Sequence, residues 1–252
     1  MAQLQRLAIA PTQIHHQQIT LTPQQHHYLS RVLRLRPSDR FIAIDGKGNW
    51  LLASFAGTSA EILEQLSIET ELPVTVTLMV ALPKGNGFDD IVRCCTELGV
   101  AVIMPVMSDR TLLHPSPQKL ERWRRIATEA AEQSERQIVP TILDPIFFSA
   151  SLSFCQEQLH GELVKNHQYI CVTRRECPNL LEYLQPKVDS NSEFYSQSIV
   201  IATGCEGGWT DAEVESAIAH GFQPVSLGSR ILRAVTAPIV AMSLVAAATE
   251  KI

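Results

Sequence analysis

The pattern of apolar and polar positions along the chain changes near residue 73. Before it, short apolar runs such as RFIAID and WLLASF are separated by turn residues, including GKGN at 46–49. Short runs joined by glycine and asparagine are typical of a β-hairpin. A longer helical period is missing here, apart from a possible turn around His26 to Leu33. We therefore expect residues 1–72 to form a small β-barrel or sandwich.

After Pro73, strand-like and helix-like patterns alternate. VTVTLMVAL (74–82) is apolar almost throughout and rich in β-branched residues, as expected of a strand buried on both faces. The apolar spacing from Phe88 to Leu98 and the sequence QKLERWRRIATEAAEQSER (118–136) predict amphipathic helices. AVIMPV, YICVT, SIVIAT and FQPVSLG predict further strands. This alternation indicates a parallel α/β sheet with helices on both faces over residues 73–252.

Helix ends are also marked in the second part of the chain. Thr210 and Glu213 have the spacing of a capping box, which predicts that a helix opens there. A terminal apolar helix is expected to begin at Thr236. The segments 144–168 and 177–197 show no clear period, so we expect them to run irregularly over the surface.

Composition and charge narrow the class of protein. Hydrophobic residues make up 45% of the chain and charged residues 19%, as in an ordinary globular protein. The formal net charge of −5 argues against coating of nucleic acid through bulk positive charge, but it allows a local basic patch. The start resembles no signal peptide, and the longest apolar stretch, 238–248, is too short for a membrane span, so we expect a cytoplasmic protein. The six cysteines and eight histidines lack zinc-type spacing, so we expect reduced thiols and no metal site.

The first candidate for chemistry is the loop GCEGG (204–208), between the strand SIVIAT and the capped helix. It is no P-loop, because no lysine follows the glycines, and it does not match G-x-G-x-x-G. Glu206 would repel a phosphate. A cationic or hydrogen-bond-donating ligand fits better, and the alternative is a tight turn whose glycines only allow positive φ.

The second candidate is LGSRILRAVTAP (227–238), which follows the strand FQPVSLG. In open α/β sheets, ligands lie outside the carboxyl ends of the strands. Both loops leave such ends, so we expect them to face one crevice. For Arg230 and Arg233, surface charge is the alternative to a binding role.

These residues together resemble a known family. GCEGGWTDAEV, followed by GFQPVSLGSRILRAVTA, resembles the signature of the RsmE family, the 16S ribosomal RNA uracil-N3 methyltransferases. ALPKGNGFDDIVRCCTELGVAVIMPVMSDRT, KLERWRRIATEAAEQSERQIVP and HHYLSRVLRLRPSDRFIAIDGKGNWL agree with that family in order and spacing. The resemblance implies an α/β fold with a SPOUT-type parallel sheet and a deep trefoil knot (73–252), preceded by a PUA-like RNA-binding β-barrel (1–72).

The resemblance also implies an activity. It implies methyl transfer from S-adenosylmethionine to N3 of a uridine in 16S ribosomal RNA, either free or in the assembled small subunit, by a homodimer. Backbone groups of the two loops would hold the cofactor, since backbone approaches a ligand closely where there is no Cβ. An apolar rim would cover the adenine. The cofactor-binding residues expected on this basis are Thr203, Gly204, Glu206, Gly207, Gly208, Leu227, Gly228, Ile231 and Leu232.

Arginines are the candidates for catalysis and for RNA binding. Uracil N3 must lose a proton, and an arginine can stabilise the developing anion without a proton transfer. Arg136 and Arg233 are the two candidates, with a phosphate contact or a structural role as the alternative. A basic run is expected to grip the RNA, with a solvated surface face as its alternative. Its residues are Arg31, Arg34, Arg36 and Arg40, and His27 and Tyr28 are expected to add stacking or phosphate contacts.

The chain departs from the usual family pattern at four places. This chain has Cys94 where the family usually has a lysine, and Glu135 where it usually has a glycine. It has Cys205 in place of a proline, and Ala234-Val235 in place of Thr-Glu. Three further hypotheses therefore stay open beside the active methyltransferase. They are a non-catalytic RNA-binding relative, a SPOUT methyltransferase acting on another RNA, and an unrelated nucleotide-binding α/β protein.

Overall fold

The computed structural model contains two compact units. The first unit is made of Met1–Glu71 and Thr128–Val139, and the second of Leu72–Ala127 and Pro140–Ile252. The chain thus enters the second unit, returns to the first for a short stretch, and then completes the second. The structure describes residues 4–159, 165–184 and 197–250.

The first unit is built on a six-stranded sheet with the order β1-β4-β5-β6-β3-β2. β1 runs parallel to β4, and the other neighbours are antiparallel. Among the described residues, β1 and β2 end this order without pairing with each other, so the expected small β domain is an open half-barrel. The strands are β1 Arg6–Ala8, β2 Ile14–His15, β3 Gln18–Thr20, β4 Arg40–Ile44, β5 Trp50–Phe55 and β6 Ser59–Leu66.

The turn between β4 and β5 confirms the predicted hairpin. The Asp45 carboxylate accepts the backbone N–H groups of Lys47 and Asn49 at 2.8 and 3.0 Å. Gly46 and Gly48 have φ angles of +69° and +107°, which side chains with a Cβ rarely adopt. The glycines therefore permit the turn and the aspartate closes it.

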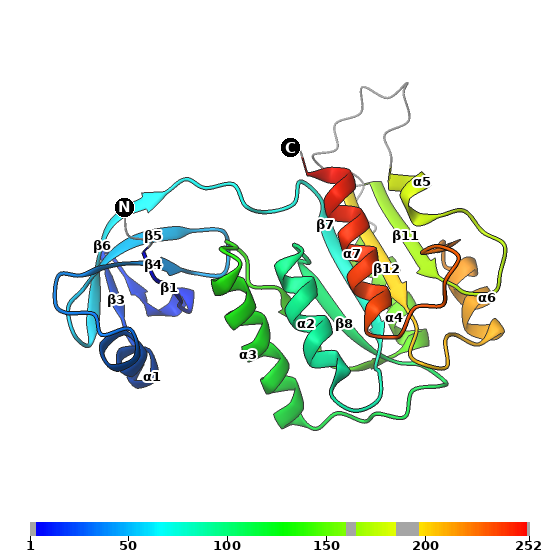
Figure 1. The fold of residues 1–252 in the computed structure, drawn as a ribbon, viewed down its shortest axis with the longest axis horizontal. Coiled ribbons are helices and arrows are strands. Elements are labelled where there is room, and N and C mark those ends of the chain that lie inside the picture. Colours follow the sequence, from blue (N-terminus) through cyan, green and yellow to red (C-terminus); the bar gives the residue numbers. More distant parts are fainter. Residues whose placement is uncertain (1–3, 160–164, 185–196, 251–252) are drawn as a thin grey trace, which may run out of the picture. The chain divides into compact units, whose positions relative to one another are not determined.

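The helical turn expected near His26 is longer than its sequence suggested. A 3₁₀ turn, η1 (Pro11–Gln13), comes first in the chain. α1 (Pro23–His27) then continues directly into the π-helical turn η2 (Tyr28–Val32). α1 lies beside the sheet (Figure 1). The Thr22 hydroxyl caps α1 by accepting the N–H of Gln25. Leu29 is fully buried in the core of the sheet.

The second unit is built on a parallel sheet with the order β10-β8-β7-β12-β11-β13, in which β9 also pairs with β8. Every pairing among these strands is parallel, which confirms the predicted sheet type. The strands are β7 Thr75–Ala81, β8 Val102–Met107, β9 Thr141–Ile142, β10 Ile146–Phe147, β11 Lys165–Cys171, β12 Gln197–Thr203 and β13 Gln223–Val225.

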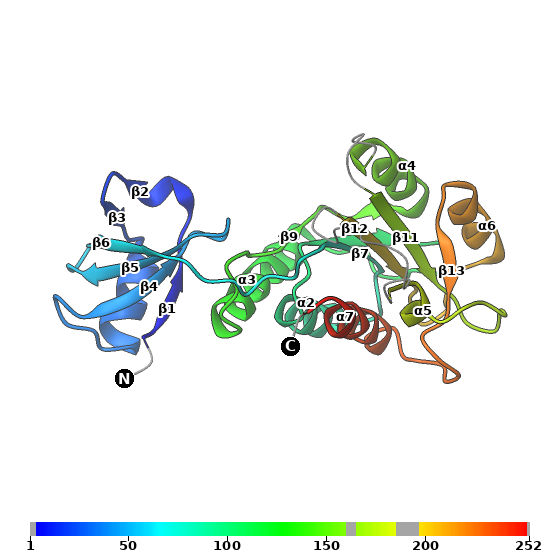
Figure 2. The same ribbon diagram turned by 90° about the horizontal axis from the view of Figure 1, so that it is seen from above.

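Helices cover both faces of this sheet, as the alternating pattern predicted. Figure 2 shows α2 and α7 on one face and α4 and α6 on the other. None of the helices in the described part of the chain is long and apolar enough to cross a membrane. The helices are α2 Gly87–Glu97, α3 Pro117–Gln133, α4 Phe148–Leu159, α5 Leu180–Leu184, α6 Asp211–Ala219 and α7 Thr236–Thr249.

The prediction of an irregular surface segment over 144–168 was wrong. α4 occupies much of it, and Phe148, Leu152 and Cys155 are buried in the core between this helix and the sheet, while residues 160–164 lie outside the described ranges. The helix was missed because its apolar residues are not confined to one face: Phe154 is 37% exposed. In the second such segment, α5 begins at Leu180, and residues 185–196 lie outside the described ranges.

Candidate active site

Three loops of the second unit leave neighbouring strands at the same edge of the sheet. β12, β11 and β13 are adjacent and parallel, so their carboxyl ends lie together. The loop 204–210 follows β12, the loop 172–179 follows β11, and the segment 226–235 follows β13. Ligands of open parallel sheets bind at this edge.

These loops line one cavity of about 830 Å³. The two loops singled out in the sequence therefore do face one crevice. Thr203 is the exception among the expected cofactor-binding residues, because it is fully buried in β12 with its hydroxyl 3.5 Å from the Met79 carbonyl oxygen. The expected residues that line the cavity are Gly204, Glu206, Gly207, Gly208, Leu227, Gly228, Ile231 and Leu232.

The glycine loop closes tightly on itself. The N–H of Gly208 donates to the Cys205 carbonyl at 2.9 Å, and Gly208 has a φ of +66°. A Cβ on Gly204 would lie 3.1 Å from the Cα of Gly208. Glycine at 204 and 208 therefore permits a turn that exposes backbone groups to the cavity.

Glu206, in the middle of this loop, has a structural partner. Its two carboxylate oxygens lie 3.1 and 3.3 Å from the backbone nitrogen of Lys84 and accept its N–H. Lys84 belongs to the loop after β7, so Glu206 joins two loops at the same edge of the sheet. This contact explains a carboxylate in a glycine turn without any ligand.

Arg110 is a site residue that the sequence reasoning missed. Its Nη1 donates to the carbonyl oxygens of Gly207 at 2.5 Å and Trp209 at 3.1 Å. A Cβ on Gly207 would lie 3.0 Å from the Arg110 Cδ, so the glycine makes room for the arginine. The available signal was its position three residues after the end of β8, at the ligand-binding edge of a parallel sheet.

A buried carboxylate holds the same two loops together. Glu213, 6% exposed, accepts the N–H groups of Asp109 at 2.9 Å and Thr210 at 2.7 Å. The second bond is part of the capping box of α6, which confirms that prediction. The Ser108 hydroxyl also lies 3.8 Å from the Cys205 sulfur. Contacts from the loop after β8 and from α6 thus hold the glycine loop at several of its residues.

Cys171, at the end of β11, also lines the cavity. Burial raises the pKa of its thiol to about 12, and the neighbouring Cys177 adds to the shift. The thiol therefore stays protonated at neutral pH, which argues against a thiolate nucleophile at this position.

The segment after β13 presents one large apolar side chain to solvent. Ile231 is 66% exposed and lines the cavity, and Leu232 beside it is half-buried. Arg233 is exposed and is not among the lining residues, and its carbonyl accepts the N–H groups that begin α7, at Thr236 and Ala237. Exposed apolar surface beside a cavity is a feature of ligand sites.

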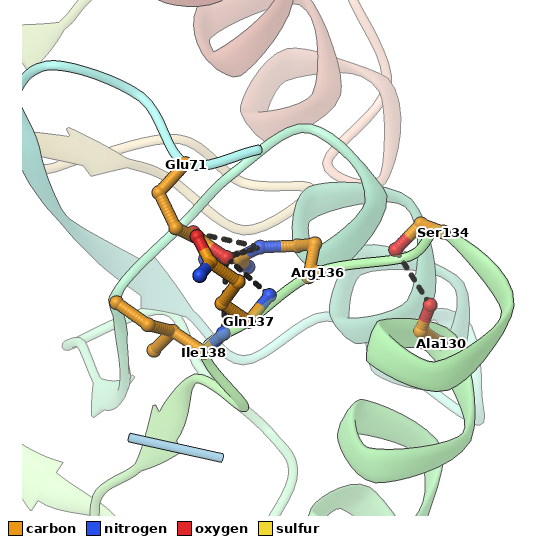
Figure 3. A network of polar contacts seen from close by, with 6 residues as sticks. All are labelled: Glu71, Ala130, Ser134, Arg136, Gln137 and Ile138. Atoms are coloured by element: carbon orange, nitrogen blue, oxygen red, sulfur yellow. Dashed lines mark hydrogen bonds and ion pairs between the residues drawn. The ribbon is translucent and has the colours of Figure 1, made fainter. Parts of the chain in front are cut away.

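Arg136, the other proposed catalytic arginine, belongs to the first unit and is 3% exposed. Figure 3 shows its guanidinium against Glu71, with Nη2 2.5 Å and Nε 3.1 Å from one carboxylate oxygen. The other oxygen of Glu71 accepts the N–H groups of Gln137 and Ile138 at 2.8 and 3.0 Å. Of the alternatives that the sequence left open, this geometry favours a structural role.

The expected RNA-binding residues lie in the first unit, on and after α1. His27, Arg31, Arg34 and Arg36 are all exposed. Arg34 has a φ of +58°, an uncommon conformation for a residue with a side chain. These side chains are accessible to a nucleic acid, and equally to solvent.

Comparison with known proteins decides the family. Residues 70–246 match a family described as the RNA methyltransferase domain, and residues 21–62 match the RNA methyltransferase PUA domain. The ribosomal RNA small subunit methyltransferase E of Synechocystis sp. is 50% identical over 248 residues, which are 97% of this chain and 78% of that protein. The chain belongs to the ribosomal RNA small subunit methyltransferase E family.

Other members of the family agree over most of their length. The Bacillus subtilis protein of the same name is 30% identical over 98% of this chain and 94% of that protein. A ribosomal RNA small subunit methyltransferase E from Neisseria gonorrhoeae, solved bound to S-adenosyl methionine, matches with a TM-score of 0.79. It is 31% identical, and the match covers 96% of each chain. The resemblance drawn from the sequence motifs is confirmed.

The structure gives physical context to the departures from the family pattern. Glu135, where the resemblance implied a glycine, has a φ of +61°, a backbone conformation that favours glycine. Val235 packs closely on Gly87: a Cβ added to Gly87 would lie 2.6 Å from a methyl carbon of Val235. Cys205 is buried, with its sulfur 4.0 Å from the Gly208 carbonyl oxygen. Burial raises the pKa of Cys94, which leaves its thiol uncharged at a position where the resemblance implied a lysine.

Proposed function

We propose that this protein transfers a methyl group from S-adenosylmethionine to N3 of a uridine in small-subunit (16S) ribosomal RNA. The observation that carries the proposal is the cavity of about 830 Å³ where the glycine loop meets the segment 226–235. A family member with 31% identity has been solved with S-adenosyl methionine bound. Activity on small-subunit RNA follows the name shared by the relatives.

The residues at the cavity fit this cofactor. Gly204 packs against the backbone of Gly208, and Gly208 has no side chain and open space where a Cβ would stand, so the backbone of the loop can approach a ligand closely. Ile231 and Leu232 provide apolar cover for an adenine ring. Glu206 is compatible with a cationic sulfonium, where it would repel a phosphate. We assign Thr203, buried in β12, a supporting role beneath the loop.

The bound cofactor supplies an electrophilic methyl group, and the protein must orient the uracil and stabilise its developing negative charge. Arg233, exposed just before α7, is our first candidate for that stabilisation. Arg136 is assigned to holding the 135–138 segment through Glu71. An arginine keeps its charge throughout, so it assists by electrostatics and not as the base for N3.

We propose that the chain has two functional domains with a boundary near residue 72. The domain before it binds RNA, and the domain after it transfers the methyl group. The PUA-type match falls in the first part, where His27, Arg31, Arg34 and Arg36 are exposed. In the second part we propose a deep trefoil knot that includes the loops of the cavity. We also propose a homodimer formed through α7, whose Ile239 and Leu244 are only partly buried within one chain.

The deciding experiment is methyl transfer to small ribosomal subunits from cells that lack this methylation. We expect label from S-adenosylmethionine to appear in 16S RNA, and mass spectrometry to place it on N3 of one uridine. Folded protein that binds the subunits without transferring label would favour the non-catalytic relative. Label at another RNA would favour a methyltransferase with a different target.

A pair of substitutions ties the activity to the cavity. Ile231→Asp should raise the KM for S-adenosylmethionine about tenfold, because it places a charge on the apolar rim. Leu112→Asp is the matched control, since Leu112 is 70% exposed in the same unit and does not line the cavity. An equal effect of both substitutions, or none of Ile231→Asp, would argue against this cavity as the cofactor site.

A further inference from the structure

Three arginines form a rim on the cavity. Arg174 and Arg175 come from the loop after β11, and Arg230 comes from the segment after β13. β11 and β13 are neighbours in the sheet, so the two loops leave it side by side. All three residues are exposed. We call them the arginine rim.

The charge of the cavity is opposite to that of the chain. Four arginines line it, against the two carboxylates Glu206 and Asp211, although the whole chain carries a formal charge of −5. Two of the arginines are occupied, since Arg110 binds loop carbonyls and Arg175 pairs with Glu215 at 2.9 Å. Arg174 and Arg230 form no ion pair within the ranges that the structure describes.

The backbone at Arg174 is a second, independent observation. Its φ is +58°, in the left-handed region that favours glycine. A residue with a side chain costs about 1 kcal/mol there, and such strain persists mainly at functional positions. The exposed loop beside the cavity thus has an arginine where its backbone conformation favours glycine.

The proposed cofactor has one carboxylate against an ammonium and a sulfonium, so its net positive charge does not call for two exposed arginines. Its sulfonium is itself a cation, so arginines near it would be repulsive. The other expected occupant is the uracil base of a uridine in an RNA strand, whose ribose is linked to a phosphate on each side. Arginine binds phosphate oxygens in a fork geometry, and such contacts position a nucleic acid without reading its sequence.

We propose that Arg174 and Arg230 bind the phosphate backbone of the RNA strand whose uridine enters the cavity. This inference rests on the proposed function and extends it, because it adds an RNA contact in the second unit to the basic residues of the first. The two arginines would hold the nucleotides that flank the target while the base reaches the methyl donor.

The test is the double substitution Arg174→Gln and Arg230→Gln, with binding to unmethylated small subunits measured over a range of salt concentrations. We expect Kd for RNA to rise at least tenfold. The slope of log Kd against log salt should fall by about 1.4, because each contact with single-stranded phosphate contributes about 0.7. The Kd for S-adenosylmethionine, measured by calorimetry, should not change. Arg93→Gln is the matched control, an exposed arginine on α2 that pairs with Asp90.

Two outcomes would overturn the inference. One is an RNA affinity and salt slope equal to those of the wild type. The other is weaker binding of S-adenosylmethionine with unchanged RNA binding, which would show that the rim holds the cofactor's own carboxylate. A wild-type protein that binds RNA without methyl transfer would refute only the proposed function, because the comparison of RNA affinities does not depend on turnover.

Discussion

Individual side chains join the glycine loop to the neighbouring loops of the candidate site. Arg110 holds two of the loop's carbonyl oxygens, and Glu206 reaches from the loop to the backbone of Lys84. Hydrogen bonds to charged groups are worth about 1.5–3 kcal/mol each. These contacts determine which way the peptide groups of the loop face, and hence what they offer to a ligand.

Arg110→Ala should weaken the binding of S-adenosylmethionine about tenfold, because the carbonyls of Gly207 and Trp209 lose their common donor. Arg110→Lys, which keeps the charge and a single donating nitrogen, should recover part of that loss. Calorimetry gives both affinities, and kcat at saturating cofactor should change less than KM. An equal fall of kcat in both variants with unchanged cofactor affinity would contradict a positioning role.

At the scale of elements, the end of α3 shows how local conformation and long-range contact meet in one residue. Glu135 has a left-handed conformation, and the N–H of Arg136 donates to the Ala131 carbonyl, as at a glycine-terminated helix. Its carboxylate also pairs with Arg6 at 2.7 Å. Glu135 thus forms an ion pair at a position whose backbone conformation favours glycine.

Two substitutions at this residue separate strain from the ion pair. Glu135→Gly and Glu135→Ala both remove the carboxylate, but only glycine accepts a φ of +61° without cost. The glycine variant should therefore be more stable than the alanine variant by about 1 kcal/mol in urea unfolding. Equal stabilities would show that the helix end relaxes out of the left-handed conformation.

At the scale of the whole molecule, the terminal helix α7 is apolar on most of its faces. Pro238, Met242 and Val245 are buried, while Leu244 and Ala248 remain partly exposed. A helix that is apolar nearly all round needs cover on more than one side. A second copy of the chain is the cover that we propose.

Light scattering should give a mass of about twice 27.9 kDa for the wild type. Ala247→Arg should lower that mass towards one chain, because Ala247 is exposed on α7 and the substitution leaves the core of one chain intact. Ala219→Arg, at the exposed end of α6, is the matched control and should not change the mass. A monomeric wild-type protein would contradict the proposed dimer.

Much of the fold could be read from local pattern. The hairpin at Gly46, the strand before Leu82, the capping box at Thr210 and the start of α7 at Thr236 all depend on residues within a few positions of each other. Turn chemistry and periodicity act over that range, so the sequence predicts them directly. α4 was missed because its period is weak.

The candidate site could be predicted only in part. The sequence by itself determined the two glycine-bearing loops, their place after parallel strands, and the family. Only the tertiary structure decided that Arg110 donates hydrogen bonds to the glycine loop and that the buried Arg136 pairs with Glu71. It also decided that residues 128–139 belong to the first unit. Such contacts link residues about 65 to 100 positions apart, and strand order, not local spacing, determines which side chains meet.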